Sequence, residues 1–320
     1  MRHVSGPRLP ESLAASCVAF VAVSMLVWTT STSSAAGSLP TPGTAAQIST
    51  LVAKSHLIKT LPSDLVPSLS NVSQDGFENY YPTIGPYGCV TDTQCVFGDI
   101  HASRTVVLYG DSHAAMWLSA LIPAVTSAHE RLVLFWFPFC PAANLEVWNP
   151  LTKSPNVQCD TQRRKFTQMI HAIDPSLVVL ADRTSGQRSF ANRPFSNLAW
   201  KTGEIQTIKA LKAATTHVAV IGDTSIFSSD VGMCLAANPS NVQKCSVNNP
   251  NPKSDQHFAS EKAAAVTQRV PYINPEPWLC TTTCSPVVGN YVVFYDQTHV
   301  SVTYAAFLSG VFGKALKKLL

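Results

Sequence analysis

The stretch VVLYGDSHAAMW, residues 106–117, passes from strand-like to helical sequence through a short polar turn. Its apolar first half has the length of a strand, and a helical pattern runs over 114–128. Gly110 allows a tight turn because it has no Cβ. Ser112 would then begin a helix, where backbone N–H groups and the helix dipole favour an oxyanion, so it is well placed for a nucleophile. The alternative is a plain junction in which Asp111 or Ser112 caps the helix.

The same alternation of strand and helix continues along the chain. Continuous apolar runs separated by helical patterns are typical of parallel strands that helices bury on both faces. We therefore predict a three-layer α/β/α fold around a mostly parallel, five-stranded sheet, with functional sites at the carboxyl ends of the strands. The predicted strands are 104–109, 131–137, 177–181, 218–221 and 291–295, and the predicted helices are 114–128, 160–173, 202–214 and 301–320.

A second polar turn, Asp296-Gln297-Thr298-His299, follows the last predicted strand. A serine hydroxyl is a weak nucleophile until a base takes its proton, and His299 can be that base. Asp296, three residues earlier, can orient the imidazole and stabilise its charged form. The alternative is a helix-capping Asp and a surface His. Together, however, the two turns offer a complete triad of Ser112, His299 and Asp296.

These turns and four segments between them resemble the SGNH (GDSL-like) hydrolase superfamily. More narrowly, they resemble the SGNH domain that follows many bacterial acyltransferase-3 membrane proteins. The resemblance implies the flavodoxin-like SGNH-hydrolase fold over about 85–320. It also implies Ser112 as nucleophile and first oxyanion N–H donor, His299 as base and Asp296 as its partner. The matching segments are VVLYGDSHAAMW (106–117), FCPAAN (139–144), VVLADR (178–183), VAVIGDTSIF (218–227), YINPEPWLCTTTC (272–284) and YDQTHVSVTYA (295–305).

The chain departs from general SGNH enzymes at two oxyanion positions. Those enzymes have a Gly after the second strand and an Asn after the third, where this chain has FPFCP (137–141) and an Asp182-Arg183 pair. Arg183 or a loop N–H is the expected substitute. We expect Asp111 to stabilise its turn and His113 to pack or hydrogen-bond behind the nucleophile. Asp182 is a further charged residue at a strand end.

Two other features near these segments are interpreted as structural. A Gly222-Asp223 turn resembles the nucleophile turn, but Thr224 follows it and no second Asp-x-x-His exists. Five tryptophans either anchor the core and loops or line a sugar site. They are Trp117, Trp136, Trp148, Trp200 and Trp278.

Eight of the nine cysteines fall in four close pairs along the chain. Each pair flanks a loop rich in Pro, Asn or Thr, so local pairing is the simplest prediction, although other connectivities are open. Cys280 and Cys284 approach metal-site spacing but have no second such pair, so we expect disulfides in an oxidising compartment and no metal. The predicted bonds are Cys89–Cys95, Cys140–Cys159, Cys234–Cys245 and Cys280–Cys284.

The N-terminal region has the order of an export signal. Two arginines precede an apolar run, 13–28, and small residues follow it. We expect residues 1–36 to be a signal peptide or, alternatively, an uncleaved signal anchor. Residues 37–84, rich in Ser, Thr and Pro, are expected to be a linker. The SGNH-like domain would cover 85–320 and lie outside the cytoplasm, either secreted or membrane-anchored.

Composition excludes several classes of protein. The chain has 320 residues, of which 13% are charged, against about 25% in an average soluble domain. A single long uncharged apolar run argues against a polytopic membrane protein, and a hydrophobic content of 46% argues against disorder. The net charge of +4 is small and no extended basic block exists, so nucleic-acid binding has no support.

The triad and the export signal, together with what the SGNH resemblance implies, predict an exported serine O-acyltransferase or O-acetylesterase that acts on cell-envelope carbohydrate through an acyl-enzyme. The expected partners are a glycan or glycolipid acceptor and an acyltransferase-3 membrane protein that delivers the acyl group. No cofactor is expected, and the protein is expected to be a monomer. The alternatives are a non-catalytic carbohydrate-binding or scaffold domain with the same fold, and a secreted lipase-like esterase.

Overall fold

The fold is described from a computed structural model, which covers residues 39–85, 88–215, 217–249 and 257–320. The expected export signal at 1–36 lies outside the described residues. Within them, no helix has the length and apolar character needed to cross a bilayer.

A six-stranded sheet forms the centre of the domain, in the order β1-β3-β2-β6-β7-β9. The last five strands in this order run parallel, and β1 pairs antiparallel with β3 at one edge. The predicted α/β fold with a mostly parallel sheet is confirmed. The strands are β1 (Val96–Gly98), β2 (Thr105–Gly110), β3 (Arg131–Trp136), β6 (Leu177–Ala181), β7 (Val218–Ile221) and β9 (Tyr272–Ile273).

The strand predicted at 291–295 is wrong as a member of this sheet. Its first two residues form β12 (Tyr291–Val292), which pairs antiparallel with β11 (Val287–Val288) in a separate hairpin. The fifth parallel strand is β9 instead. Val293 and Phe294 are nevertheless buried in the core. A short apolar run therefore signalled burial correctly but could not specify a pairing partner.

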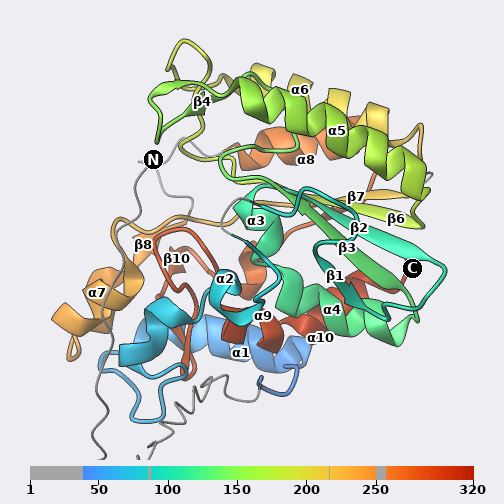
Figure 1. Cartoon of the computed structure of the whole chain (residues 1–320). Helices are drawn as coiled ribbons and strands as arrows, with labels where there is room; N and C mark the ends of the chain where they lie inside the picture. The colour runs from blue at the N-terminus through green and yellow to red at the C-terminus, as the bar shows by residue number, and fades with distance from the viewer. Residues whose placement is uncertain (1–38, 86–87, 216, 250–256) are drawn as a thin grey trace, which may run out of the picture. The chain divides into compact units, whose positions relative to one another are not determined.

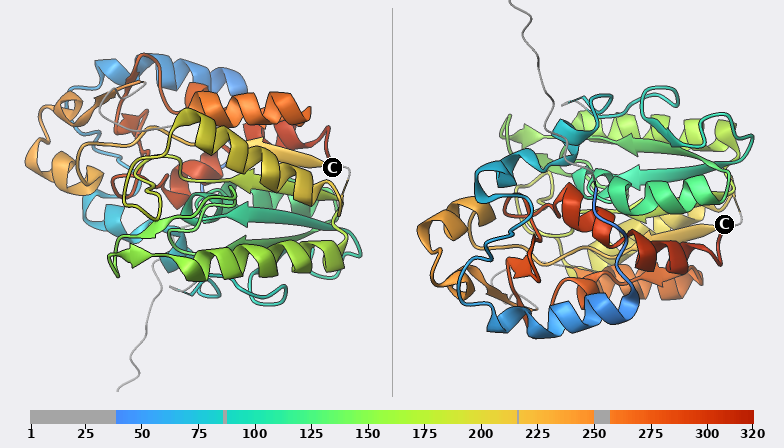
Figure 2. Two further views of the ribbon diagram at one scale, coloured as in Figure 1. Left: turned by 90° about the horizontal axis from the view of Figure 1, so that it is seen from above. Right: turned by 90° about the horizontal axis from the view of Figure 1, so that it is seen from below.

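Helices cover both faces of the sheet (Figure 1). The helices α5 (Val157–Ile173), α6 (Asn197–Leu211) and α8 (Phe258–Gln268) lie on one face. On the other lie α4 (Leu118–Ser127), α9 (Val302–Phe307) and α10 (Ser309–Leu316), and Figure 2 shows each layer from its own side.

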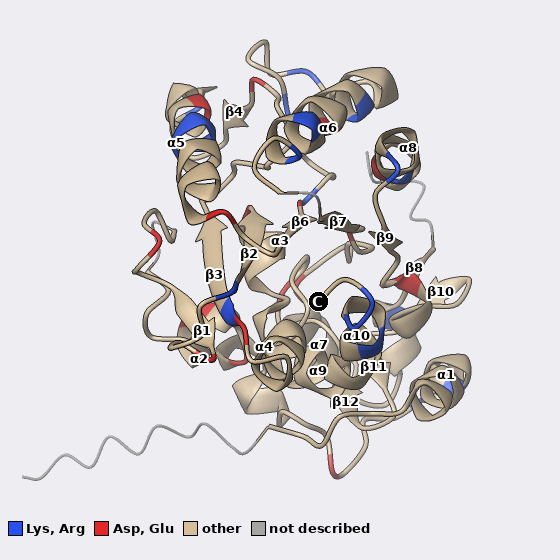
Figure 3. Cartoon of the chain, turned by 90° about the vertical axis from the view of Figure 1, so that its right-hand side faces the viewer, with Lys and Arg blue, Asp and Glu red and all other residues tan. Residues whose placement is uncertain are grey.

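Alternate residues of the strands supply the two apolar layers. In β2, Val107 and Tyr109 belong to the cluster under α5 and α6, whereas Val106 and Leu108 belong to the cluster under α4 and α10. Because both sets are buried, the strand reads as one continuous apolar run. Outside these apolar layers, Figure 3 shows Lys and Arg on helices such as α5, α6 and α10.

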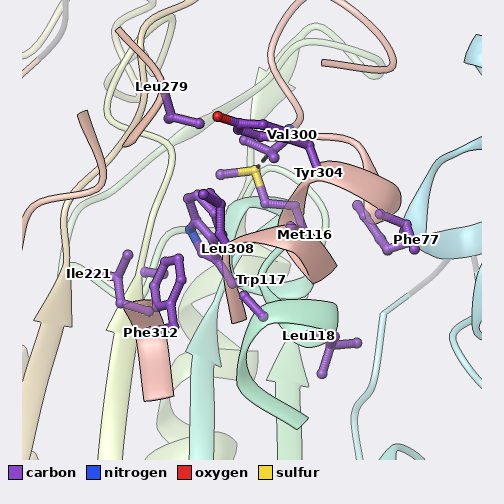
Figure 4. Close-up of a cluster of buried hydrophobic side chains, with 14 of the residues drawn as sticks. Phe77, Met116, Trp117, Leu118, Ile221, Leu279, Val300, Tyr304, Leu308 and Phe312 are labelled. Carbon is purple, nitrogen blue, oxygen red and sulfur yellow. Dashed lines mark hydrogen bonds between the residues drawn. The ribbon is translucent and has the colours of Figure 1, made fainter. Parts of the chain in front are cut away.

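The larger apolar cluster holds the start of the helical segment after β2 in place (Figure 4). The helix predicted at 114–128 is divided into α3 (Ser112–Ala115) and α4. At the junction, the Trp117 ring packs 4.9 Å from Phe312 of α10, and both side chains are fully buried. The turn that carries Ser112 therefore rests on closely packed, buried apolar side chains.

Residues 39–84 are part of the domain, which differs from the expected linker. They form α1 (Ala45–Lys54), a 3₁₀ segment (Leu69–Gln74) and α2 (Phe77–Tyr80). Four apolar side chains of this segment are buried in the larger cluster, whereas Ser49, Thr50, Ser70 and Ser73 on the first two of these helices are exposed. These side chains are Ile48, Val52, Val72 and Phe77.

All four predicted disulfides are present: Cys89–Cys95, Cys140–Cys159, Cys234–Cys245 and Cys280–Cys284. Each closes a short loop, and Cys140–Cys159 ties the loop after β3 to the first turn of α5. They fit an oxidising compartment.

Candidate active site

The turn after β2 lies against the end of β6 because Gly110 has no side chain. A Cβ at Gly110 would lie 1.9 Å from the Ala181 carbonyl oxygen, so only glycine fits. The two strand ends, and the loops that follow them, are consequently brought together. Ser112 is the first residue of α3, where a helix N–H has no acceptor within the helix.

Asp111 fixes this turn, as predicted from the sequence. Its buried carboxylate accepts the His113 N–H at 2.9 Å and the Arg183 N–H at 3.1 Å. The Gln187 side-chain amide lies 3.4 Å from the same carboxylate. Burial raises the pKa of Asp111, and the nearby His113 opposes that rise. Asp111 therefore couples the loop after β2 to the loop after β6.

The structure brings Ser112, His299 and Asp296 together in one hydrogen-bonded line. The His299 Nε2 atom lies 2.8 Å from Ser112 Oγ, and His299 Nδ1 lies 2.7 Å from Asp296 Oδ2. With Nδ1 protonated, the ring would donate to the carboxylate and accept from the serine hydroxyl. This is the arrangement that a base-activated nucleophile requires.

The short Asp296–His299 loop organises itself around the carboxylate. Asp296 Oδ1 accepts the backbone N–H groups of Thr298 and His299, both at 2.7 Å. Burial opposes ionisation of Asp296, but the hydrogen bond from the His299 side chain and these N–H groups lower its pKa to about 2. The carboxylate is thus held charged beside the imidazole.

Two aromatic rings set the orientation of His299. The Tyr295 ring stacks on the imidazole with centroids 5.6 Å apart, and Phe77 meets it edge-on at 5.9 Å. Tyr295 in turn donates its hydroxyl to Glu78 at 3.1 Å. Phe77 and Glu78 belong to the segment expected to be a linker, so nothing in the sequence pattern connected them with His299.

His113 forms a second, buried His–Asp pair directly behind the first. Its Nδ1 lies 2.7 Å from Asp223 Oδ1, and its ring centroid is 5.0 Å from that of His299. Asp223 also accepts the backbone N–H and hydroxyl of Thr184 at 2.8 and 2.9 Å. Burial disfavours its charge, but the interactions with His113 and these N–H donors lower the pKa of Asp223 below its ordinary value. His113 thus packs behind Ser112, and the Gly222-Asp223 turn supplies its hydrogen-bond partner.

Asp182 and Arg183 follow β6 but point to different sides. The buried Asp182 carboxylate accepts the N–H groups of Ala142 and Ala143 at 2.7 and 2.9 Å, so it anchors the loop after β3. Burial, with Asp111 nearby, raises its pKa well above the ordinary range. Arg183 instead lines the pocket in front of Ser112.

The pocket in front of Ser112 has a volume of about 420 Å³. Ser112 and His299 line it, together with residues Phe137–Phe139 of the loop after β3. Sequence reasoning named Ser112, His299, Asp111, Arg183 and Trp136 of its lining, as well as the segment 137–141 that contains Phe139. It missed Gln187, although that residue stands in a strand-end loop that the topology rule already favours. The lining is Glu78, Asp111, Ser112, Trp136, Phe137, Pro138, Phe139, Asn149, Leu151, Gln158, Arg183, Gln187 and His299.

Only one group of three side chains among the described residues has the spacing of a metal site, Glu276 with Cys280 and Cys284. The two sulfurs are joined in a disulfide, so they cannot act as thiolate ligands.

Comparisons with known proteins agree with this architecture. A family model described as SGNH domain (fused to AT3 domains) matches residues 81–314. The periplasmic domain of a lipopolysaccharide acetyltransferase from Salmonella ser. Paratyphi A shares the fold with a TM-score of 0.56 and 15% identity, over 79% of this chain and 98% of that one. A carbohydrate acetylesterase from Sinorhizobium meliloti matches at a TM-score of 0.41 and 11% identity, over 68% of this chain and 100% of that one. No curated protein sequence matches the chain.

Proposed function

The chain belongs to the family of SGNH domains fused to acyltransferase-3 domains, and we propose that it is an exported serine O-acyltransferase or O-acetylesterase of envelope carbohydrate. The observation that carries the proposal is the hydrogen-bonded line from Asp296 through His299 to Ser112 Oγ, which opens into a pocket. The four disulfides support a site of action outside the cytoplasm.

In the first half-reaction, Ser112 Oγ attacks the acyl carbonyl carbon while His299 Nε2 takes the hydroxyl proton. A tetrahedral oxyanion forms, and the Ser112 backbone N–H is its first donor. The C–O bond to the leaving alcohol then breaks, and His299 returns the proton to that alcohol. The product is an acyl ester on Ser112, and Asp296 stabilises the imidazolium in both steps.

In the second half-reaction, a sugar hydroxyl or water attacks the acyl-Ser112 carbonyl and gives its proton to His299. Collapse of the second tetrahedral oxyanion releases the new ester or the free acid and restores the serine hydroxyl. The same residues serve both outcomes, so the acceptor is decided by what occupies the pocket. Family membership favours transfer, with an acyltransferase-3 membrane protein as the source of the acyl group.

Arg183 is the strongest candidate for the second oxyanion donor. It lines the pocket beside Ser112, and its Nε atom is buried without a hydrogen-bond partner in the described structure. An unpaired cationic N–H can donate to the oxyanion, whose negative charge develops only in the transition state. Removal of one such donor costs about 10²–10³-fold in kcat.

The proposal is tested by hydrolysis of p-nitrophenyl acetate with wild type and Ser112→Ala. We expect Ser112→Ala to lose about 10⁶-fold in kcat, because the nucleophile acts as a unit with its base. Mass spectrometry of the quenched wild type should show an acetyl group on the peptide that contains Ser112. Equal turnover by both proteins, or no acyl-Ser112 with any acyl donor, would favour a non-catalytic carbohydrate-binding domain instead.

A further inference from the structure

A second pocket, of about 360 Å³, adjoins the one that contains Ser112. The two pockets share Phe139, Arg183 and Gln187 in their walls, so a molecule that fills both would pass directly in front of the nucleophile. The residues that belong to the second pocket alone are Trp148, Pro150, Ser185, Gly186, Arg188 and Asn192.

The wall of the second pocket carries positive charge without a compensating carboxylate. The loop 183–193 (RTSGQRSFANR) holds three arginines and no Asp or Glu, in a chain that is otherwise poor in charge. Two of them, Arg183 and Arg188, line the pocket, and its lining contains no acidic residue. Among the described residues no salt bridge involves Arg188. An exposed arginine fork is suited to bidentate binding of a carboxylate or phosphate.

Two buried polar atoms at this pocket lack a partner in the described structure. The Ser185 side chain is fully buried, and its Oγ makes no hydrogen bond. The other is the Nε of Arg183, which both pockets share and which we assign to the oxyanion, so Ser185 Oγ is the unpaired atom that belongs to the second pocket alone. Buried polar atoms are nearly always satisfied, so unpaired ones that line a cavity indicate a bound group that completes them.

The pocket is held in shape by backbone pairing between its two walls. Trp148 donates its N–H to the Arg188 carbonyl at 2.6 Å, and Phe190 donates to the Glu146 carbonyl at 3.0 Å. Arg188 and the half-buried ring of Trp148 are thereby fixed on neighbouring segments. A large apolar ring beside a few convergent polar groups is the usual composition of a small-molecule site, and it fits the apolar face and hydroxyl rim of a sugar.

We propose that the second pocket binds an anionic sugar unit of the acceptor glycan, with Arg188 on its carboxylate or phosphate and Trp148 against its ring. This assignment rests on the proposed function, since it places the acceptor next to acyl-Ser112. The acidic unit bound here would leave a neighbouring sugar hydroxyl in the Ser112 pocket.

The experiment is calorimetric titration of wild type and Arg188→Ala with methyl glucuronide, glucose 1-phosphate and methyl glucoside. We expect the acidic sugars to bind wild type at least about tenfold more tightly than methyl glucoside, because the neutral sugar cannot make a charged hydrogen bond to Arg188. Arg188→Ala should lose that preference, and added salt should lower the affinity of wild type for the acidic sugars only. The tighter of the two acidic sugars identifies carboxylate or phosphate as the recognised group.

The matched control is Arg193→Ala, which removes an exposed arginine of the same loop that does not line the pocket. It should bind like wild type. Equal affinity for neutral and acidic sugars, no binding of either, or the same loss in both variants would overturn the assignment. Wild type and Arg193→Ala should both hydrolyse p-nitrophenyl acetate, so a failed binding result is distinguished from a failure of the acyl-enzyme proposal, which would remove that hydrolysis from wild type itself.

Discussion

The two His–Asp pairs of this domain have the same geometry and different surroundings. The Nδ1–Oδ distance is 2.7 Å in both His299–Asp296 and His113–Asp223, and the two imidazoles lie 5.0 Å apart. The side chains of the first pair are 14% and 34% exposed, and those of the second are 1% and 0% exposed. His299 Nε2 contacts Ser112 Oγ at 2.8 Å, whereas His113 Nε2 has no hydrogen-bond partner in the described structure.

Pair geometry alone therefore does not assign a role to a His–Asp pair. An exposed pair can gain and lose a proton during a reaction cycle, because water and substrate reach it. A fully buried pair pays a desolvation penalty for any uncompensated charge, so it stabilises the fold only while both partners are present. We therefore expect the same Asp→Asn change to act on the rate in one pair and on stability in the other.

The largest effect is expected for Asp296→Asn, which should lower kcat/KM for p-nitrophenyl acetate by about 10⁴-fold. The amide can still accept the Thr298 and His299 N–H groups, but it no longer stabilises the imidazolium. The melting temperature should fall by no more than about 4 °C, because the site is partly exposed. A variant that keeps more than a tenth of the wild-type rate would remove Asp296 from the reaction.

Asp223→Asn is the matched change in the buried pair and should act mainly on stability. The amide NH₂ would face a donor from His113 or Thr184, which leaves a buried polar group unsatisfied. Breaking a buried pair costs about 3–5 kcal/mol, and we expect a melting temperature lowered by about 10 °C. Because the pKa of Asp223 is depressed in the folded state, this stabilisation is present above pH about 4 and disappears as the pH falls through the folded value.

Activity separates the two pairs in the same variant. Well below its melting temperature, Asp223→Asn should keep kcat/KM within about tenfold of wild type, since Asp223 does not contact the reacting atoms. A 10⁴-fold loss with an unchanged melting temperature would place His113–Asp223 in the proton-transfer chain and end the distinction.

The fold class could be predicted because parallel buried strands read as apolar runs. The strands at 105–110, 131–136, 177–181 and 218–221 were all visible in this way. The run at 291–295 is equally apolar and equally buried, but it lies in the layer below the sheet. Pairing depends on which backbone edge is free. The free edge of β7 is paired by β9, which has only two residues, too few to show a periodic pattern in the sequence.

The site could be predicted in part because Ser112 and Asp296–His299 each stand in a polar turn. The expectation that both turns end strands of one sheet is wrong, since Asp296 follows a hairpin outside it. Hydrogen bonds to Asp296 within the loop hold it in shape, so the Asp296–His299 turn does not need to follow a strand of the central sheet. The orienting rings could not be predicted, because the contact of Phe77 with His299 depends on how 39–84 folds back over the core.

Asp75, in that same segment, is a buried carboxylate without a histidine partner in the described structure, and we expect its replacement to have the smallest effect. It lies behind the helix that follows His299, where its carboxylate accepts the Thr303 N–H at 3.2 Å and the Thr303 hydroxyl at 2.9 Å. Burial raises the pKa of Asp75 to about 6, although the bonds from Thr303 oppose the rise. A carboxyl group whose folded pKa is raised binds its proton more tightly in the folded state. Its contribution is therefore most favourable below pH about 4 and is lost as the pH rises through 6.

Asp75→Asn removes this titration while it keeps an acceptor for Thr303. We expect urea unfolding to give similar stabilities for the two proteins at pH 4, and at pH 7 a stability advantage of at most about 3 kcal/mol for the variant. Asp296→Asn should show the opposite sign, since its depressed pKa makes wild type the more stable protein above pH about 4. A difference between wild type and Asp75→Asn that stays constant from pH 4 to 7 would mean that Asp75 titrates as an ordinary surface carboxylate. The segment over His299 would then be open to water, and the exposed and buried carboxylates of this domain could no longer be told apart by their pH dependence.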